Sequence, residues 1–507
     1  MMPSLLIFLI FLIAATLMFL RKLPALLALP LMAIAIAGVE LMMGRLSVRD
    51  LTMGVLADGA IRLADPMIIS FFGGMLSVIM QKSGVAESFI RRGAEFSGDN
   101  PWSVAVFMLA LITLLFTTIG GLGAVIMVGT IALPILSSMG VREHISAGIM
   151  LFGITIGGVL NAGNWIVYQS VLHLETNVVS SYAIWIFFIV GLGALGFITV
   201  ELFRTGLLRL SKRWWLRSGL VLMISGSVLF LSYRLFLTCD VNFKNFFTTI
   251  LDGLLLLLLL SIILDLFRKA ERQLKHCVRW YAYLIPVIPL LLIMRFDMPF
   301  VPAFMIGVVY AMVAVRRKGL LNLTTRSVIE GSAGVIPAVV LMIGIGMLLS
   351  SILGPTKTGP GKYWYETETV AQTSVTQDVQ SPQQEWPVLA EMKPLLENMI
   401  PHSFGTYVLI FALLGPLALY RGPLNVWGLG YGVGGVLLAT GVPAGAVMGI
   451  LMSLGMIQGV SDPTNTANVW VANELHLDVN TIMWRTLPYT WIVATVGLII
   501  AGVKFFG

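Results

Sequence analysis

Long apolar segments, separated by short polar linkers, recur along the chain from its first residues to its last. Many of them hold seventeen or more residues with few charges, close to the roughly 20 apolar residues that a helix needs to cross a membrane. The first, residues 4–20, has Arg21 and Lys22 after it, whereas a signal peptide carries its positive charge before the apolar run. The pattern predicts an all-α polytopic membrane protein that retains its first helix.

Four polar breaks interrupt this pattern. They are TTIGGLGA (117–124), NAGN (161–164), YRGPLN (420–425) and SDPTNTAN (461–468). The first and third separate apolar halves that are short for a span, which predicts re-entrant hairpins with the break at the tip. The second and fourth lie inside the spans 145–175 and 444–475 and predict discontinuous helices. Non-helical backbone survives in a membrane only where protein or a water-filled cavity covers it, so we expect the four breaks to build one internal site.

The two ends of the chain resemble each other in sequence. The alignments pair 140–165 with 441–466, 172–177 with 475–480, and 57–76 with 329–348. The segment 66–81 leads to Lys82, Arg91 and Arg92, which are expected in the cytoplasm, whereas its counterpart leads to an external polar segment. The two halves are therefore predicted to be inverted-topology repeats, an arrangement typical of transporters.

Clusters of basic residues set the expected sidedness and the domain boundaries. By the positive-inside rule, the basic linkers near 204–217, 268–279 and 316–318 face the cytoplasm. The apolar stretches between them, 219–237 with 248–266 and 280–294 with 301–315, each predict an out-and-back pair. We expect a first repeat over 1–203, basic linkers with an extra transmembrane hairpin over 204–279, and a second repeat over 280–507 with an external polar insertion at 355–397.

Composition and charge narrow the function classes. Of the 507 residues, 58% are hydrophobic and 11% are charged, and the net charge of +7 lies in short linkers, where it marks topology and forms no nucleic-acid face. Cys239 and Cys277 are expected on opposite sides of the membrane, so neither a disulfide nor a metal site is predicted. The sequence lacks a nucleophile with a positioned base, metal-ligand spacing and a phosphate loop, which argues against an enzyme and against a bound cofactor.

The breaks supply the candidate site residues. Pro463 ends a helix because it lacks a backbone donor, and the freed carbonyls and polar side chains near it can replace a hydration shell. Helix N-termini past the hairpin tips, at 123–125 and 425–427, are expected to direct partial positive charge at an anion. The predicted substrate-binding residues are Thr117, Thr118, Gly120, Gly121, Gly123, Asn161, Gly163, Asn164, Arg421, Gly422, Asn425, Ser461, Thr464, Asn465, Thr466 and Asn468. Asp462, an acid inside the membrane, is the predicted site for the coupling ion or proton, and Arg421 is expected to meet a carboxylate.

The layout of residues 71–90 and 461–499, including the Asp-Pro of the second broken helix, resembles the ion transporter superfamily, most closely the gluconate:proton symporters and citrate carriers. The resemblance implies two inverted repeats and a hairpin and broken-helix transport domain that moves against a scaffold, in an elevator-like way. It also implies that the four breaks line the substrate site. The tips lack the Ser-Asn-Thr signature of the dicarboxylate:sodium branch, which favours protons over sodium.

We therefore expect a multi-pass protein of the cell inner membrane that carries a small organic carboxylate by cation-coupled symport, with the proton as the expected cation. Its expected partners are the organic anion, membrane lipid and a second copy of the chain in a homodimer. One alternative is a sodium/proton antiporter, in which Asp462 exchanges the two ions. Another is the membrane subunit of a carrier that depends on an external binding protein, docked on 355–397.

Overall fold

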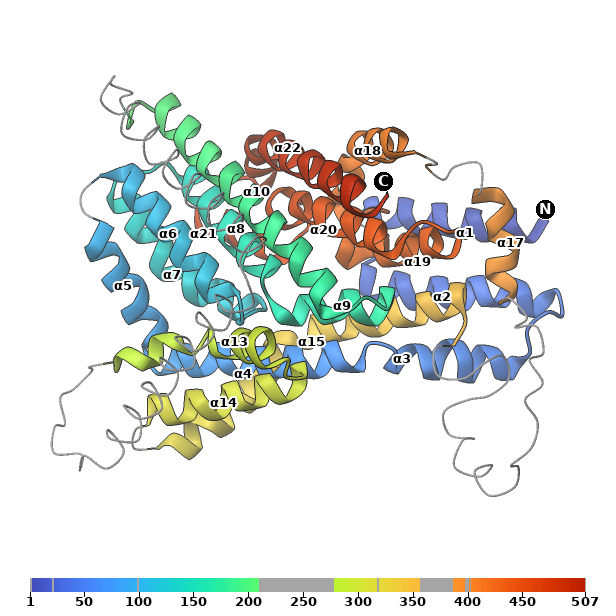
Figure 1. Cartoon of the computed structure of the whole chain (residues 1–507), viewed down its shortest axis with the longest axis horizontal. Coiled ribbons are helices and arrows are strands. Elements are labelled where there is room, and N and C mark those ends of the chain that lie inside the picture. The colour runs from blue at the N-terminus through green and yellow to red at the C-terminus, as the bar shows by residue number, and fades with distance from the viewer. Residues whose placement is uncertain are drawn as a thin grey trace, which may run out of the picture.

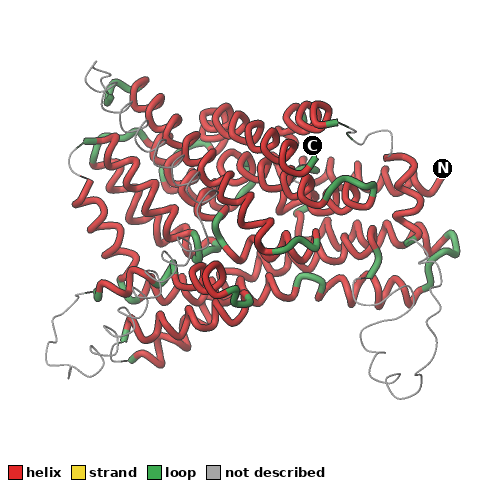
Figure 2. Tube along the Cα trace, viewed as in Figure 1, coloured by secondary structure: helices red, strands yellow, loops and turns green. Residues whose placement is uncertain are grey.

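The computed structural model describes residues 2–20, 22–97, 100–208, 278–316, 319–355, 386–396, 401 and 403–506. The predicted hairpin at 219–266, most of the insertion at 355–397, and both cysteines lie outside the described residues. The regular elements in the described part are helices (Figure 2). Six of them are long and apolar enough to cross a membrane, or up to eight if each bent pair counts as one span. The predicted all-α polytopic membrane protein is confirmed at this level.

The first half of the chain runs from α1 to α10 (Figure 1). Its elements are α1 (Met2–Phe19), α2 (Ala25–Met42), the π-helix η1 (Asp50–Asp58), α3 (Gly59–Ile61), α4 (Ala64–Lys82), α5 (Val85–Ser97), α6 (Pro101–Phe116), α7 (Leu122–Ser138), α8 (Glu143–Val159), α9 (Ala162–Leu172) and α10 (Thr176–Arg204). Together η1, α3 and α4 form one continuous apolar span.

The second half runs from η2 to α22 and differs from expectation at its start. Its elements are η2 (Trp280–Leu284), α13 (Ile288–Phe296), α14 (Phe300–Val315), α15 (Leu320–Leu353), α17 (Pro387–Leu396), α18 (Phe404–Leu413), η4 (Gly415–Arg421), η5 (Val426–Gly430), α19 (Tyr431–Ala439), α20 (Ala444–Ser461), α21 (Thr466–Glu474) and α22 (Val479–Phe505). The expected single span at 280–294 is wrong. A 3-10 turn and a short helix replace it, because Pro286 and Pro289 each remove a helix donor there.

The helix α15 packs along a seam of glycines against the continuous span that contains α3 and α4, and Figure 1 shows α4 and α15 side by side. A Cβ atom on Gly74 would collide with the carbonyl oxygen of Gly331, and one on Gly346 would collide with that of Gly59. Gly59 faces Gly346 and Gly74 faces Gly331, so the residue numbers rise along one helix as they fall along the other. The helices are therefore antiparallel. The sequence alignment pairs Gly59 with Gly331 and Gly74 with Gly346, so the two contacts are reciprocal. Glycine here allows the backbones to approach closely.

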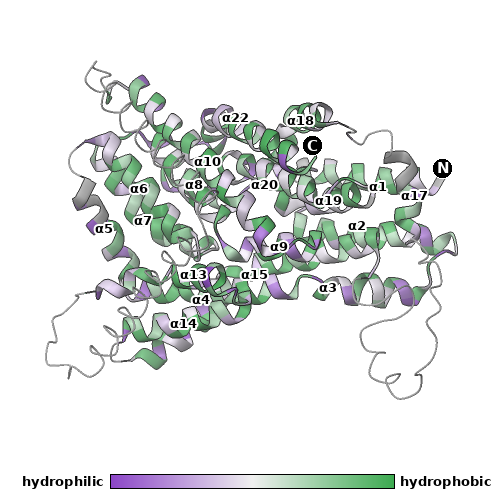
Figure 3. Cartoon of the chain, in the orientation of Figure 1, coloured by the Kyte–Doolittle hydropathy of each residue, from purple (hydrophilic) through white to green (hydrophobic). Residues whose placement is uncertain are grey.

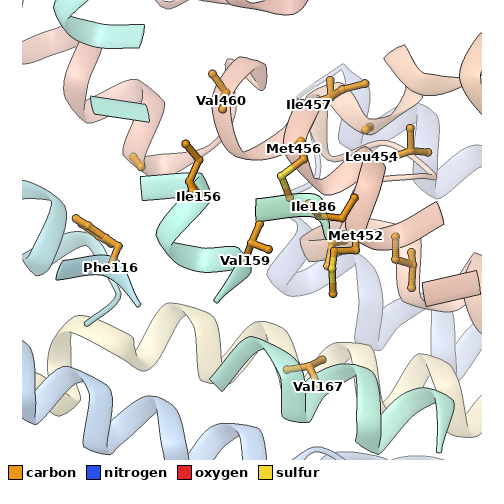
Figure 4. Packing of buried hydrophobic residues seen from close by; sticks show 14 of the residues in the cluster. Phe116, Ile156, Val159, Val167, Ile186, Met452, Leu454, Met456, Ile457 and Val460 are labelled. Carbon is orange, nitrogen blue, oxygen red and sulfur yellow. The ribbon is translucent and has the colours of Figure 1, made fainter. Parts of the chain in front are cut away.

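The broken helices and the last span of each half form a second layer. Close contacts join α20 to α22, α8 to α6, and α10 to both α8 and α22. Buried side chains of α8 and α20, among them Ile156, Val159, Met456 and Val460, gather where the two helices meet (Figure 4). Apolar residues cover most of the helices, and hydrophilic residues appear near α9 and α20 inside the molecule (Figure 3). Polar residues therefore lie in the interior between the two layers.

Candidate functional site

Two helices are interrupted at the positions that the sequence predicts. The bend between α8 and α9 is 54°, and Asn161 caps α9 by accepting a hydrogen bond from the Gly163 amide at 2.9 Å. The gap between α20 and α21 contains Pro463, and Asn465 caps α21 by accepting from the Ala467 amide at 3.1 Å. Each capping side chain satisfies a helix donor that would otherwise be unpaired in the membrane interior.

The two hairpin tips also lie where the sequence predicts them, but they differ in form. In the first, α7 starts at Leu122, immediately after Gly121 with φ of +81°. In the second, the regular helix that was expected at 425–427 is absent. A short π-helical turn with non-helical angles at Trp427 and Gly428 comes first, and α19 begins only at Tyr431. Only the first tip therefore leads directly into an α-helical N-terminus.

Each helix break is tied to its hairpin by hydrogen bonds. In the first half, Asn161 Nδ2 donates to the Phe116 carbonyl at 3.2 Å. In the second half, the aligned residue, Asp462, accepts from the Tyr420 amide at 2.9 Å and from Asn425 Nδ2 at 2.9 Å. The same position of each half therefore fixes the break to the end of the incoming hairpin arm.

The four breaks surround one cavity of about 950 Å³. Its polar wall comes from both hairpin tips and both helix breaks. This wall contains ten of the predicted residues: Thr118, Gly120, Gly121, Asn161, Gly163, Asn164, Arg421, Thr464, Asn465 and Thr466. The rest of the lining is mostly apolar and comes largely from α2, α4, α14 and α15, for example Ala25, Ile69, Phe304 and Leu341, with Ser70 of α4 as a polar residue. The tips and breaks, which are far apart in the sequence, thus meet at one internal space.

Arg421 is the only Asp, Glu, Lys, Arg or His among the described residues that line this cavity. Its Nη1 donates to the Trp427 carbonyl at 3.0 Å, which fixes the side chain across the tip. A guanidinium has five N–H donors, so this bond leaves others for a ligand. The cavity therefore presents one fixed positive charge among neutral groups.

The remaining seven predicted residues lie outside the cavity lining. They are Thr117, Gly123, Gly422, Asn425, Ser461, Asp462 and Asn468. Several are buried and bonded within the protein: Ser461 Oγ lies 2.8 Å from Thr486 Oγ1, and Asn468 Nδ2 donates to the Val460 carbonyl at 3.0 Å. These side chains hold the breaks in shape from behind the polar wall.

Asp462 joins the second break to the second tip. Its carboxylate accepts four hydrogen bonds, from the backbone amides of Tyr420 and Thr464, the Thr464 hydroxyl and Asn425 Nδ2, at 2.7 to 2.9 Å. The side chain is 1% exposed. A carboxylate has about four lone-pair positions, so a cation that binds to these oxygens must displace at least one donor.

Two amide oxygens near this carboxylate are buried without a hydrogen-bond partner: Asn425 Oδ1 and Asn468 Oδ1. The amide nitrogens of the same residues donate to the Asp462 carboxylate and to the Asp462 carbonyl, respectively. Unpaired buried acceptors cost free energy, and in native proteins they often indicate an absent ion or water. Oxygen ligands of this kind suit a small hard cation.

Sequence reasoning missed several residues that line the cavity. Tyr420, Trp427 and Gln458 come from the second tip and from α20, and Tyr168 and Tyr431 also line the cavity, with ring centroids 6.1 Å apart. Gln458 could have been found, because a lone glutamine three residues before a helix break resembles the other polar residues of the breaks. The aromatic residues had no such signal, since they read as ordinary core side chains.

The chain was also compared with known proteins. No protein-family model matches it, and no curated protein matches it in sequence.

Proposed function

We propose that this protein is a secondary active transporter that carries a small organic carboxylate by cation-coupled symport. The observation that carries the proposal is that Arg421 is the one charged side chain among the described residues that line the cavity. A cation at membrane depth costs at least ~2.5 kcal/mol on insertion scales, so intramembrane arginines usually serve a function. A carboxylate can offset that cost, because a guanidinium forms two parallel charge-assisted hydrogen bonds with it.

The volume of the cavity and its polar lining suit a small, polar anion. Its volume of about 950 Å³ is at the upper end of the usual range for small-molecule sites, which leaves room for water around a compact ligand. Asn161 and Asn164 stand on the same wall as Arg421, and each side-chain amide uses one N–H within the protein and keeps a second for a hydroxyl or second carboxylate group. The lining from α2, α4, α14 and α15 is mostly apolar, with Ser70 among it, so the tips and breaks supply most of the polar recognition.

Three local similarities support the proposal that the halves are inverted repeats. The glycine contacts between α15 and the span that contains α3 and α4 are reciprocal under the alignment. His173 and His476, which align, both adopt the left-handed conformation, with φ of 52° and 53°. Asn161 and Asp462, which also align, both bind the incoming hairpin arm. In the transport cycle we propose, the tips and breaks move as one body against a scaffold that includes α2 and α14.

The coupling cation is proposed to act at Asp462. A proton is the cation that the sequence favours, and the lone pairs of this carboxylate already accept four hydrogen bonds, so protonation would release part of the tip. The unpaired oxygens of Asn425 and Asn468 favour sodium as the second candidate, because they offer neutral oxygen ligands beside the acid. Either ion, bound at Asp462, would change the hydrogen bonds that join the second helix break to the hairpin tip that carries Arg421.

Uptake into proteoliposomes tests the proposal. The purified chain is reconstituted, and the uptake of a panel of labelled mono-, di- and tricarboxylates is measured under a proton gradient, a sodium gradient and neither. Gradient-driven uptake of a carboxylate is the expected result, and the effective gradient identifies the cation. Sodium/proton exchange without carboxylate uptake would establish the antiporter instead. Uptake that appears only after a soluble external protein is added would establish the binding-protein-dependent carrier.

A further inference from the structure

A second charged site lies away from the transport cavity, at the predicted cytoplasmic ends of α8, α10 and α22. Its centre is Glu201, whose side chain is 1% exposed. Its carboxylate accepts from Arg204 Nη1 at 2.7 Å and from the Tyr489 hydroxyl at 3.3 Å. Arg485 Nη1 lies 3.7 Å away, within ion-pair distance but too far for a hydrogen bond. Two arginines therefore share one carboxylate, and His144 Nε2 approaches it at 3.8 Å.

Both arginines also line a surface pocket of about 500 Å³. The other lining residues, Thr481, Trp484, Pro488 and Tyr489, lie along one face of α22 at helical spacing. The side chains of Arg204 and Arg485 are 59% and 48% exposed, so their free donors are accessible from the pocket. One negative charge against two positive charges leaves the pocket with a positive excess.

The pocket continues into the apolar outer surface of the same helices. Beyond Trp484, the exposed large hydrophobic residues of α22 are Ile492, Val496, Ile499 and Val503, and those of α10 near Arg204 are Val200 and Phe203. The two helices lie side by side along the molecule (Figure 1). Arg485 lies six residues into α22, about 9 Å along the axis from its first residue, at the predicted cytoplasmic end of this apolar helix. Trp484 beside it is 68% exposed, and tryptophans are enriched where membrane helices meet the headgroups.

We propose that this pocket binds the phosphate headgroup of an anionic phospholipid from the cytoplasmic leaflet. Arg204 and Arg485 bind the phosphate oxygens, Thr481 supplies a hydroxyl, and the acyl chains lie along the exposed apolar faces of α10 and α22. Basic pockets between membrane helices on the cytoplasmic side suit such headgroups. Glu201 opposes the bound phosphate and limits its affinity, because it competes for the same two guanidinium groups. A soluble anion would gain nothing from the apolar extension of the pocket, so the lipid is the occupant that the surface favours.

Thermal unfolding of the full-length protein in detergent tests this site. Phosphatidylglycerol and phosphatidylcholine with identical chains are titrated separately. Phosphatidylglycerol is expected to raise the melting temperature at lower lipid concentration than phosphatidylcholine. In the double variant Arg204→Gln with Arg485→Gln, the apparent affinity for phosphatidylglycerol is expected to fall roughly 30-fold. Arg91→Gln is the matched control, because Arg91 is 67% exposed and pairs with Glu87 on the same predicted side of the membrane.

Soluble phosphates distinguish a lipid site from a simple anion site. Glycerol phosphate and inorganic phosphate should protect far less than phosphatidylglycerol, and equal protection would overturn the lipid in favour of a soluble anion. A preference for phosphatidylglycerol that survives in the double variant, or that is absent from the unaltered protein, would overturn the site. Glu201→Gln should shift affinity in the opposite direction and tighten binding. If that buried variant does not fold, the arginine variants, whose side chains are about half exposed, still decide the question.

Discussion

The two hairpin tips occupy matched places in the two halves and differ in chemistry. The first uses glycine: Gly120 and Gly121 carry no side chains, and Gly121 takes the left-handed conformation at φ of +81°. The second places Tyr420 and Arg421 in left-handed conformations, at φ of 55° and 56°. A left-handed residue with a side chain costs roughly 1–2 kcal/mol. The second tip therefore accepts backbone strain that the first avoids.

Hydrogen bonds hold the strained backbone of the second tip in place. The Tyr420 amide donates to Asp462, and Arg421 Nη1 donates to the Trp427 carbonyl. The first tip has no acid at the matched break position, where Asn161 binds a carbonyl instead. Strained backbone persists where its surroundings hold it and is concentrated at functional sites. The comparison indicates that the second tip is held in a strained backbone conformation that places the charged side chain of Arg421 at the cavity. The first tip has only glycines, Gly120 and Gly121, at the matched place.

The largest effect is expected from making the second tip resemble the first. Arg421→Gly should lower carboxylate uptake at subsaturating substrate by roughly 10- to 100-fold, because the charge-assisted bonds to substrate are lost. Stability should change by less than about 1 kcal/mol, since glycine adopts a left-handed conformation readily. Arg421→Lys should retain partial uptake, because lysine keeps the positive charge but cannot form the two parallel hydrogen bonds of a guanidinium.

Uptake in proteoliposomes and thermal unfolding measure the two effects on the same preparations. Arg91→Gln again serves as the control for the loss of an arginine outside the cavity. Full uptake in the Arg421→Gly variant would remove the charged tip from the mechanism and strengthen the antiporter alternative.

The next effect concerns the acid that holds the second tip. Asp462→Asn replaces one acceptor oxygen with an amide group that faces a donor, so one of the four donors loses its partner. The variant should lose roughly 1–3 kcal/mol of stability, and uptake should lose its response to the coupling gradient. Thermal unfolding and uptake with and without the gradient measure both. If Asp462→Asn keeps the native melting temperature and gradient response, the acid neither holds the tip nor couples the ion.

A smaller effect is expected at the turn of the first tip. Gly121→Ala should cost roughly 1–2 kcal/mol, because its φ is positive. The added Cβ would also lie 3.1 Å from the Gly334 carbonyl oxygen on α15. The melting temperature should fall, and uptake should fall with the amount of folded protein. An unchanged melting temperature would show that the first tip does not depend on its left-handed glycine.

The smallest effect is expected one residue earlier. Gly120 has a φ outside the left-handed range, and an added Cβ would meet no atom within 4 Å. Gly120→Ala should therefore leave stability within about 0.5 kcal/mol of the native protein. Because Gly120 lines the cavity, the methyl group should affect substrate affinity more than stability. Both glycines line the cavity, so binding and unfolding measurements on this variant, set beside Gly121→Ala, show how much of the Gly121→Ala effect comes from its left-handed backbone.

The sequence by itself determined where helices are interrupted, because α8 and α9 and then α20 and α21 are separated at two of the four polar breaks. This was possible because the signals are local. Pro463 removes a backbone donor, Asn161 and Asn465 cap the helix that follows, and apolar runs of spanning length surround them. The seam between α15 and the span that contains α3 and α4 was visible only as aligned glycines, whose reciprocal contact required the structure.

Only the tertiary structure decided which polar residues of each break face the cavity. Arg421 and Thr464 reach it, whereas Asn425 and Asp462, each within four residues of one of them, point behind the wall and bond to each other. The reason is geometric. At a break, neighbouring residues leave the helical period, so the direction of each side chain depends on the turn that the tip adopts and on the element that packs against it. The left-handed angles at Tyr420 and Arg421 set that turn, and they are stabilised by a bond to Asp462, which lies 42 residues away from Tyr420 in the chain.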